Sequence, residues 1–323
     1  MRSCKVKSFA KINLDLRVLN KRPDGFHDLR TVFQTISLAD TIDITFDKSR
    51  RTTIAIDGNI DIPDNLIVRA AEAVCDSGRV TGDIRFRLTK RIPMGAGLGG
   101  GSSNAAAVLL ALPTLAGAPL DAPKLTQIGA ALGSDVPFFL HGGTALGIGR
   151  GTEIYPLPDL PACSGLLITP GIHVSTPEAY SALNRGLTTV GVEPDTGKFQ
   201  ALVWGMEGDR LLGRWGEDCA NDFESAVFAR HPQLKSIREK LRRTGAKPAR
   251  MTGSGSALFG LFESKEQSAK AADVFSRWSE TKDAGQHAIS LIGRRRYRTV
   301  WWNQLKDHSS GRIWPPQSRY SRP

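Results

Sequence analysis

A glycine-rich segment that runs directly into an alanine-rich stretch constrains this chain more than any other feature. Residues Lys90–Ala107 read KRIPMGAGLGGGSSNAAA, with five glycines between Gly95 and Gly101. Glycine permits tight turns that bring bare N–H groups close to oxygen atoms, and a helix N-terminus adds unpaired donors and a positive dipole. The segment therefore predicts a phosphate-binding loop at the start of a helix. Its residues are Pro93, Met94, Gly95, Ala96, Gly97, Leu98, Gly99, Gly100, Gly101, Ser102 and Ser103.

Three other interpretations of this segment are weaker. The Walker A loop needs a lysine after its last glycine, where this chain has Ser102. Residues 95–100 do fit the G-x-G-x-x-G pattern, and Asp121 lies at about the distance of the ribose-binding acid. However, the preceding strand Asp83–Thr89 alternates polar and apolar residues, and no second strand precedes Asp121, which disfavours a dinucleotide-binding fold. A flexible linker would not run directly into an alanine-rich helix.

Alternation of polar and apolar residues predicts several β-strands. In Lys11–Val18, period 2 places Lys11, Asn13 and Asp15 on the face opposite the core, where we expect them to be exposed. The same pattern predicts further strands at Ile42–Phe46, Ile54–Ile56, Ile84–Leu88, Gly165–Thr169 and Leu258–Phe262.

Helix signals lie between these strands. The expected helices are one capped by Asp64 or Asn65, one over Ser103–Leu112 that stops at Pro113, one from Asp121 to near Gly133, and others at Pro177–Leu183, Asn221–Arg243 (interrupted at Pro232) and Lys265–Trp278. Residues 134–137 are expected in a loop. The mixture predicts an α+β protein with two domains that meet at a cleft, residues 1–160 and 161–293, followed by a basic tail at 294–323 of unknown order.

Length and composition agree with a soluble two-domain protein. The chain has 323 residues, 40% of them hydrophobic and 23% charged. It has no run of about 18 apolar residues and no apolar signal core near its start, so we expect neither a membrane span nor secretion. The four cysteines are far apart and show no CxxC pairing, so reduced thiols in the cytoplasm are expected rather than a zinc site or disulfides.

The net charge is concentrated at the C-terminal end. Residues 294–323 hold eight arginines or lysines against one aspartate, so they carry +7 of the net charge of +11. The rest of the chain is only mildly basic. A terminal basic segment is more often solvated than a specific reader of nucleic acid, so we expect a peripheral tail and no nucleic-acid partner.

Phosphoryl transfer without a Walker lysine needs positive charge from another residue and a base for the acceptor hydroxyl. Lys11 is a candidate for the charge, although alone it fits a solvated surface lysine. Asp135 alone fits a loop or capping aspartate. The two become candidates only in combination with the glycine loop.

Six motifs occur in a familiar order and at familiar spacing. They are AKINLDL, RPDGFHDLRTVFQ, DNLIVRAA, KRIPMGAGLGGGSSNAA, GSDVPFF and MTGSGS. Over about residues 4–280 the chain resembles the GHMP kinase superfamily, which the glycine loop marks. AKINL, RPDGFH and GSDVPFF point within it to the 4-diphosphocytidyl-2-C-methyl-D-erythritol kinase family.

The resemblance implies a ribosomal-S5-like N-terminal domain and a ferredoxin-like C-terminal domain. It implies that ATP, with Mg²⁺, phosphorylates the 2-hydroxyl of cytidine-diphosphate-linked methylerythritol in the non-mevalonate isoprenoid pathway. We expect a cytoplasmic protein that is a monomer or a weak homodimer.

The resemblance also assigns roles to residues. Lys11 and Asp135 match the catalytic pair, with Asp135 as proton acceptor and Lys11 keeping it ionised. Asn65 and Lys90 match positions near the adenosine. The substrate-binding matches are Asn13, Phe26, His27, Phe33, Thr176 and Tyr180, of which Phe26, His27 and Tyr180 would hold the cytosine.

Two departures from the family pattern stand out. Position 26, usually tyrosine, is Phe26 here, which keeps a stacking ring but loses a hydroxyl, and the segment beyond about Trp278 is longer than usual. No carboxylate cluster identifies magnesium ligands. The alternatives are another GHMP kinase, acting on mevalonate, homoserine or a sugar, and an RNA-binding S5-like protein. RPDGFH argues against the first, and the glycine loop with GSDVPFF against the second.

Overall fold

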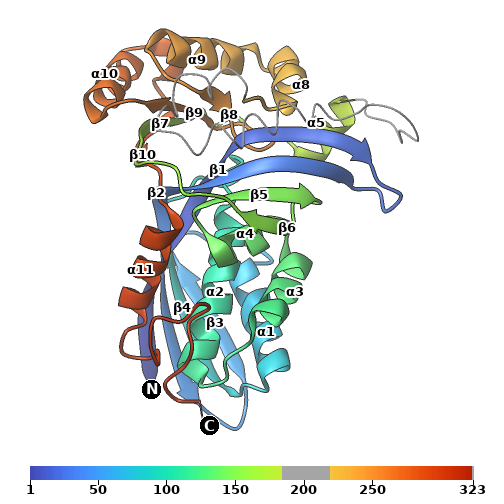
Figure 1. Cartoon of the computed structure of the whole chain (residues 1–323), viewed down its shortest axis with the longest axis vertical. Coiled ribbons are helices and arrows are strands. Elements are labelled where there is room, and N and C mark those ends of the chain that lie inside the picture. The colour runs from blue at the N-terminus through green and yellow to red at the C-terminus, as the bar shows by residue number, and fades with distance from the viewer. Residues whose placement is uncertain (184–218, 322–323) are drawn as a thin grey trace.

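The computed structural model describes residues 1–183 and 219–321, which form two β-sheets covered by helices (Figure 1). The strands of the first sheet are β1 (Arg2–Lys21), β2 (His27–Lys48), β3 (Thr53–Gly58), β4 (Gly82–Thr89), β5 (Thr144–Gly149) and β6 (Glu153–Pro156). Their order is β3-β4-β2-β5-β6 with β1 paired to β2, and all pairs are antiparallel except β3 with β4. Helices α1 (Leu66–Gly78), α2 (Gly100–Ala116) and α4 (Val136–His141) pack against this sheet, and α3 (Ala122–Leu132) packs on these three helices.

The second sheet is antiparallel, with the order β10-β7-β9-β8. Its strands are β7 (Ser164–Thr169), β8 (Ala249–Met251), β9 (Leu258–Phe262) and β10 (Gly285–Ser290), accompanied by helices α5 (Thr176–Ala182), α8 (Phe223–Arg230), α9 (Pro232–Arg243) and α10 (Lys265–Ser276). The predicted α+β class is confirmed. We propose that the domain boundary lies near residue 160, between the last strand of the first sheet and the first strand of the second.

The long strand β1 connects the two halves of the molecule (Figure 1). Its buried apolar residues enter three successive cores, with Val6 and Phe9 in the first, Ala10, Ile12 and Leu14 in the second, and Leu16 and Val18 in the third. Register shifts between Phe9 and Lys11 and between Asn13 and Asp15 interrupt its pairing with β2. Irregularities of this kind bend a strand and re-aim its side chains, which here lets one strand serve both domains.

The expected exposure of the polar face of β1 is wrong. Lys11, Asn13 and Asp15 are only 2–3% exposed. An added Cβ on Gly99 would lie 3.2 Å from Cγ of Lys11, and Oδ1 of Asn13 accepts from the N–H of Gly253 at 2.9 Å, so other segments cover this face. The alternation of polar and apolar residues correctly assigned the side chains to two faces of the strand, but both faces are buried.

Helix α2 is the buried centre of the N-terminal half. Every residue from Ser103 to Leu115 is buried, as expected for a helix that is apolar on all sides. The predicted stop at Pro113 is wrong, because the helix continues to Ala116 and ends at Gly117, whose φ of +79° is left-handed. A proline inside a helix loses one N–H hydrogen bond, but tertiary burial around the last turn offsets that loss.

The loop predicted at residues 134–137 is also partly wrong. Val136 and Pro137 already belong to helix α4, and Asp135 occupies its N-cap position. Proline is well tolerated in the first turn, because the N–H it lacks would have no intrahelical partner there. By contrast, Asp121 caps α3 as predicted, and of the two residues expected to cap α1, Asn65 does so; they accept hydrogen bonds from the N–H groups of Lys124 and Ile67.

The C-terminal segment is folded onto the N-terminal half, so the expectation of a solvated tail is wrong for residues 294–321. Helix α11 (Arg294–Gln304) runs beside β1 (Figure 1). Tyr297, Trp301 and Leu305 are at most 1% exposed and belong to the first core. The basic residues of the helix lie around this apolar stripe.

Among residues 1–183 and 219–321, no helix combines the length and the apolar character that crossing a bilayer requires.

Candidate active site

The glycine loop closes against the C-terminal half of the chain. Gly95, Gly97 and Gly99 have φ values of +64°, +76° and +68°, in the left-handed region that favours glycine. A Cβ on Gly97 would collide with the carbonyl oxygen of Thr252, so only glycine fits this contact. The N–H of Ala257 donates to Ala96 O at 3.3 Å. The loop is therefore held between the two halves, at the N-terminus of α2.

The side chain of Asp135 turns away from its own helix. An aspartate at an N-cap usually accepts a hydrogen bond from an N–H of the first turn, but Asp135 makes no such bond. Instead its Oδ2 lies 3.4 Å from Nζ of Lys11, and the Lys11 side chain is 4% exposed while that of Asp135 is 27% exposed. A Cβ on Gly99 would lie 3.2 Å from Cγ of Lys11, so the ion pair borders the glycine loop.

Asn13 organises the surroundings of Lys11. Its Oδ1 accepts from Nζ of Lys11 at 2.7 Å and from the N–H of Gly253 at 2.9 Å, and its Nδ2 donates to Oγ1 of Thr31 at 2.8 Å. The amide oxygen and one of the two amide N–H groups are therefore bonded within the protein. These bonds fix the Lys11 ammonium and join β1 to the MTGSGS segment.

A pocket of about 370 Å³ lies along the glycine loop. It is lined by the predicted residues Asn65, Lys90, Pro93, Met94, Gly95, Ala96, Gly97, Leu98, Gly99, Gly100, Gly101 and Ser102. Ser103 lies outside it, because its buried hydroxyl donates to Phe9 O at 2.6 Å. The ammonium of Lys90 forms an ion pair with the fully buried Asp40, a partner that the sequence did not indicate.

A second pocket, of about 1070 Å³, lies between the two halves of the chain. Among its lining residues are the predicted Phe26, His27, Thr176 and Tyr180. It meets the first pocket near Ser102, since a Cβ on Gly133, which lines the second pocket, would lie 3.6 Å from the Ser102 hydroxyl oxygen.

The aromatic groups of this pocket pair differently from the arrangement that the resemblance suggested. The rings of His27 and Tyr180 stack on each other, with centroids 4.8 Å apart and an angle of 21°. Phe26 is half-exposed, and the guanidinium of Arg150 lies 3.6 Å from its ring centroid. Arg150 and Lys21 also line the pocket and were not predicted. No motif marked either residue.

Two ionisable groups in this pocket have shifted pKa values. Burial, and then the charge of Lys21, lower the pKa of His27, so its imidazole is neutral near pH 7. Burial, and then the charge of Asp135, raise the pKa of Tyr180 to about 12, so its hydroxyl remains protonated. Both groups can therefore donate hydrogen bonds, and His27 can also accept one.

Phe33 is the predicted substrate residue that the structure places in the core. Its side chain is 2% exposed and stacks on Phe138 with centroids 4.9 Å apart. The Nζ of Lys11 lies 5.6 Å from its ring centroid, so Phe33 forms an apolar wall behind the ammonium.

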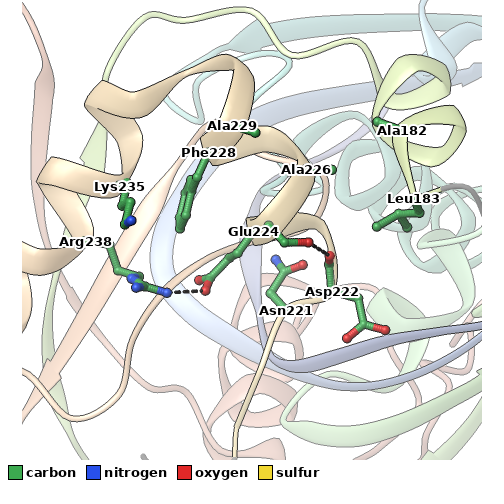
Figure 2. Close-up of a pocket in the computed structure, with 11 residues that line it drawn as sticks. Ala182, Leu183, Asn221, Asp222, Glu224, Ala226, Phe228, Ala229, Lys235 and Arg238 are labelled. Carbon is green, nitrogen blue, oxygen red and sulfur yellow. Dashed lines mark hydrogen bonds and ion pairs between the residues drawn. The ribbon is translucent and has the colours of Figure 1, made fainter.

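A third cavity, of about 850 Å³, opens between α5, α8 and α9 (Figure 2). None of the predicted site residues lines it. Its charged residues stabilise the structure, because Arg238 forms an ion pair of 2.8 Å with Glu224, and Glu224 accepts from the N–H of Met251. Asn221 donates to the carbonyls of Met251 and Gly253. These bonds hold the MTGSGS segment, which contacts the glycine loop. The residues of this cavity therefore support the site from outside it.

Comparison with known proteins identifies the family. The model named GHMP kinases N terminal domain matches residues 65–143, and GHMP kinases C terminal matches residues 209–280. A 4-diphosphocytidyl-2-C-methyl-D-erythritol kinase of Solibacter usitatus (strain Ellin6076) is 53% identical over 99% of this chain and 98% of the relative. The chain belongs to the 4-diphosphocytidyl-2-C-methyl-D-erythritol kinase family.

A further relative and a solved structure agree with this assignment. The kinase of the same name from Geobacter metallireducens (strain ATCC 53774 / DSM 7210 / GS-15) is 38% identical over 87% of this chain and 96% of its own. A solved 4-(cytidine 5'-diphospho)-2C-methyl-D-erythritol kinase has a TM-score of 0.73 at 35% identity, covering 90% of this chain and 99% of its own. A homoserine kinase from Cytophaga hutchinsonii shares the fold alone, with a TM-score of 0.69 at 19% identity over 92% and 96% of the two chains. The resemblance drawn from the six motifs is confirmed, and the kinase interpretation prevails over RNA binding.

Proposed function

We propose that this enzyme transfers the γ-phosphate of ATP to the 2-hydroxyl of 4-diphosphocytidyl-2-C-methyl-D-erythritol. The ion pair of Lys11 and Asp135 beside the glycine loop is the observation that carries the proposal. It supplies a carboxylate for the hydroxyl proton and a cation for the developing charge, next to a loop suited to phosphate.

In the proposed reaction, Asp135 accepts the proton of the acceptor hydroxyl as the oxygen attacks the γ-phosphorus. Lys11 keeps Asp135 ionised and neutralises charge on the transferring group. Among residues 1–183 and 219–321 the Lys11 ammonium has two partners, Asn13 and Asp135, and an ammonium has three donors, so we propose that the third reaches a phosphate oxygen. The exposed part of the Asp135 carboxylate admits the acceptor.

The residues around the loop suit a magnesium ion that arrives with ATP. Among the residues that the structure describes, no cluster of three acidic, histidine or cysteine side chains forms a metal site of its own. Magnesium is commonly held by substrate phosphates with few protein ligands, and here Ser102 would contribute its hydroxyl. The ion would offset the negative charge of the phosphates.

Identification of the product tests the proposed function. Phosphorus NMR of the product formed from the cytidylated substrate is expected to show a new phosphomonoester on the carbon that carries the 2-hydroxyl. A phosphate on another hydroxyl, or release of inorganic phosphate alone, would reject the proposed reaction.

Recognition of the cytosine is proposed to divide between a stacking residue and an edge-reading residue. The half-exposed ring of Phe26 suits stacking, and neutral His27 offers one donor and one acceptor to the polar edge of the base. Lys21 and Arg150 place positive charge in the same pocket, which suits the diphosphate.

Two substitutions separate these roles. Phe26→Ala is expected to weaken binding of the cytidine substrate and its uridine analogue alike, by about 1–3 kcal/mol, because stacking does not distinguish the bases. His27→Ala is expected to narrow the preference for cytidine over uridine. Steady-state kinetics on both substrates measures this, and each variant is the control for the other. An unchanged cytidine-to-uridine ratio in His27→Ala would assign base reading to other groups.

Binding of the ATP phosphates by the loop is tested best at Gly101. A side chain at Gly99 would meet Phe139 at 2.9 Å and also face a positive φ, so it would disturb the fold itself. At Gly101 an added Cβ meets only Leu66, at an ordinary 3.6 Å. Gly101→Val is therefore expected to keep the melting temperature within a few degrees, yet to raise the Kd for ATP by about tenfold or more, because its branched side chain blocks the helix N-terminus.

Calorimetric titration with ATP provides the measurement. Gly311→Val, at an exposed glycine with no atom within 4 Å of an added Cβ, is the matched control and should bind like the wild type. Equal ATP affinity in Gly101→Val and the control would show that this part of the loop does not bind the phosphates.

A further inference from the structure

The carbonyl groups at the end of helix α4 are bonded by side chains of the C-terminal segment. The buried hydroxyl of Tyr297 donates to Phe139 O at 2.5 Å, and Nε1 of Trp314 donates to Leu140 O at 2.9 Å. The last four carbonyls of a helix have no intrahelical donor, and a helix of six residues is too short to be stable without tertiary support. The C-terminal segment therefore supplies donors that α4 lacks.

The same contact fixes the position of the helix end. The Tyr297 ring lies directly on Gly142, the C-cap residue of α4, where any added Cβ would overlap the ring. The guanidinium of Arg294 donates to the carbonyls of Thr144 and Leu157, just beyond the helix. Neither the hydroxyl nor the ring of Tyr297 reaches solvent.

Helix α4, which is about one and a half turns long, has this contact at its C-terminal end and the reaction site at its N-terminal end. Asp135 is its N-cap residue, and its carboxylate faces Lys11. Phe139, whose carbonyl Tyr297 holds, lies with its ring against Gly99, since an added Cβ there would be 2.9 Å from the ring. A shift of Phe139 would thus move both Asp135 and the wall of the glycine loop.

We propose that Tyr297 and Trp314 are positioning residues, which hold α4 so that Asp135 meets the acceptor hydroxyl beside the glycine loop. This inference rests on the proposed function, in which Asp135 is the base. It gives the C-terminal extension a part in catalysis although it lies outside all six motifs.

Removal of single hydrogen bonds tests the proposal. Tyr297→Phe keeps the buried ring and deletes only the hydroxyl, and it is expected to lower kcat by about tenfold, because small misplacements of catalytic groups reduce rates strongly. KM for ATP should change less than kcat, because Tyr297 bonds the carbonyl of Phe139 directly but reaches the glycine loop only through the Phe139 ring. Trp314→Phe should act in the same direction.

Tyr320→Phe is the matched control. It makes the same change in the same segment, but within the described part of the chain the Tyr320 hydroxyl bonds His308 and Asp307, neither of which belongs to α4. Its kcat should equal that of the wild type. A Tyr297→Phe variant with wild-type kcat, or a Tyr320→Phe variant with an equal loss, would overturn the positioning role.

A double-mutant cycle distinguishes positioning from general destabilisation. If Tyr297 acts through Asp135, then adding Tyr297→Phe to Asp135→Asn should lower kcat by less than about twofold further. A full additional tenfold loss would contradict this route. If Asp135→Asn alone keeps the wild-type kcat, the proposed base is wrong and the inference falls with it. If Asp135→Asn loses activity but Tyr297→Phe does not, only the inference fails.

Discussion

Asp135→Asn is expected to lower kcat by about 10²–10⁴-fold, the range typical for loss of a general base. Asparagine keeps the size of the side chain but cannot take the hydroxyl proton. The affinity for ATP should change little, because Asp135 does not line the pocket along the glycine loop. Steady-state kinetics together with ATP titration separates these two quantities.

Asp121→Asn is the matched control for this substitution. Both aspartates are N-cap residues, but Asp121 uses its side chain to cap α3 through the N–H of Lys124, a role that asparagine performs equally well. The control should keep wild-type kinetics. Near-wild-type kcat in Asp135→Asn would instead assign that residue to structure, or show that Lys11 and the phosphates suffice.

Trp301→Ala is expected to reduce the free energy of unfolding by about 3–5 kcal/mol, the usual loss for a large aromatic side chain removed from a core. Trp301 is 1% exposed and packs in the core of the N-terminal half. Trp302→Ala, on the next residue of α11, is the control. It is partly exposed and lies outside that core, so its loss should be about 1 kcal/mol. Urea denaturation measures both.

Truncation after Gly293 extends this prediction. It removes Tyr297, Trp301 and Leu305 together, and the summed loss is comparable with the whole stability of about 5–15 kcal/mol of a typical domain. The truncated chain is therefore expected to be insoluble or largely unfolded. A soluble truncated enzyme with the melting temperature of the full chain would show that α11 adds nothing to the fold.

The parts of the structure that the sequence predicts well are those that depend on local chemistry. The tight turns of the glycine loop follow from the spacing of glycines ahead of a helix, and Gly95, Gly97 and Gly99 there have left-handed φ angles. The caps Asn65 and Asp121 follow from side chains that bond their own backbone. Each of these features is determined within a few residues of the chain.

The features that were missed depend on distant segments. Alternation in β1 cannot show that the face carrying Lys11 is covered by the glycine loop and by Gly253. Likewise, no local pattern links Lys90 to Asp40, which lies 50 residues earlier. Pairings of this kind are created by the tertiary fold.

The C-terminal segment did contain a usable signal. Tyr297, Trp301 and Leu305 recur every four residues, which is the spacing of one face of a helix. The prediction of a solvated tail used the net charge of the segment, which comes mainly from its arginines, and not this periodicity. Charge describes the solvated side of such a helix, whereas periodicity describes the side that packs.

The central claim is tested most directly by initial rates of ATP consumption with saturating magnesium-ATP and a panel of acceptors. The panel consists of 4-diphosphocytidyl-2-C-methyl-D-erythritol, mevalonate, homoserine and a sugar. We predict turnover with the cytidylated acceptor, and rates near the acceptor-free background with the other three. Comparable turnover on mevalonate or homoserine, or none on the cytidylated acceptor, would contradict the account.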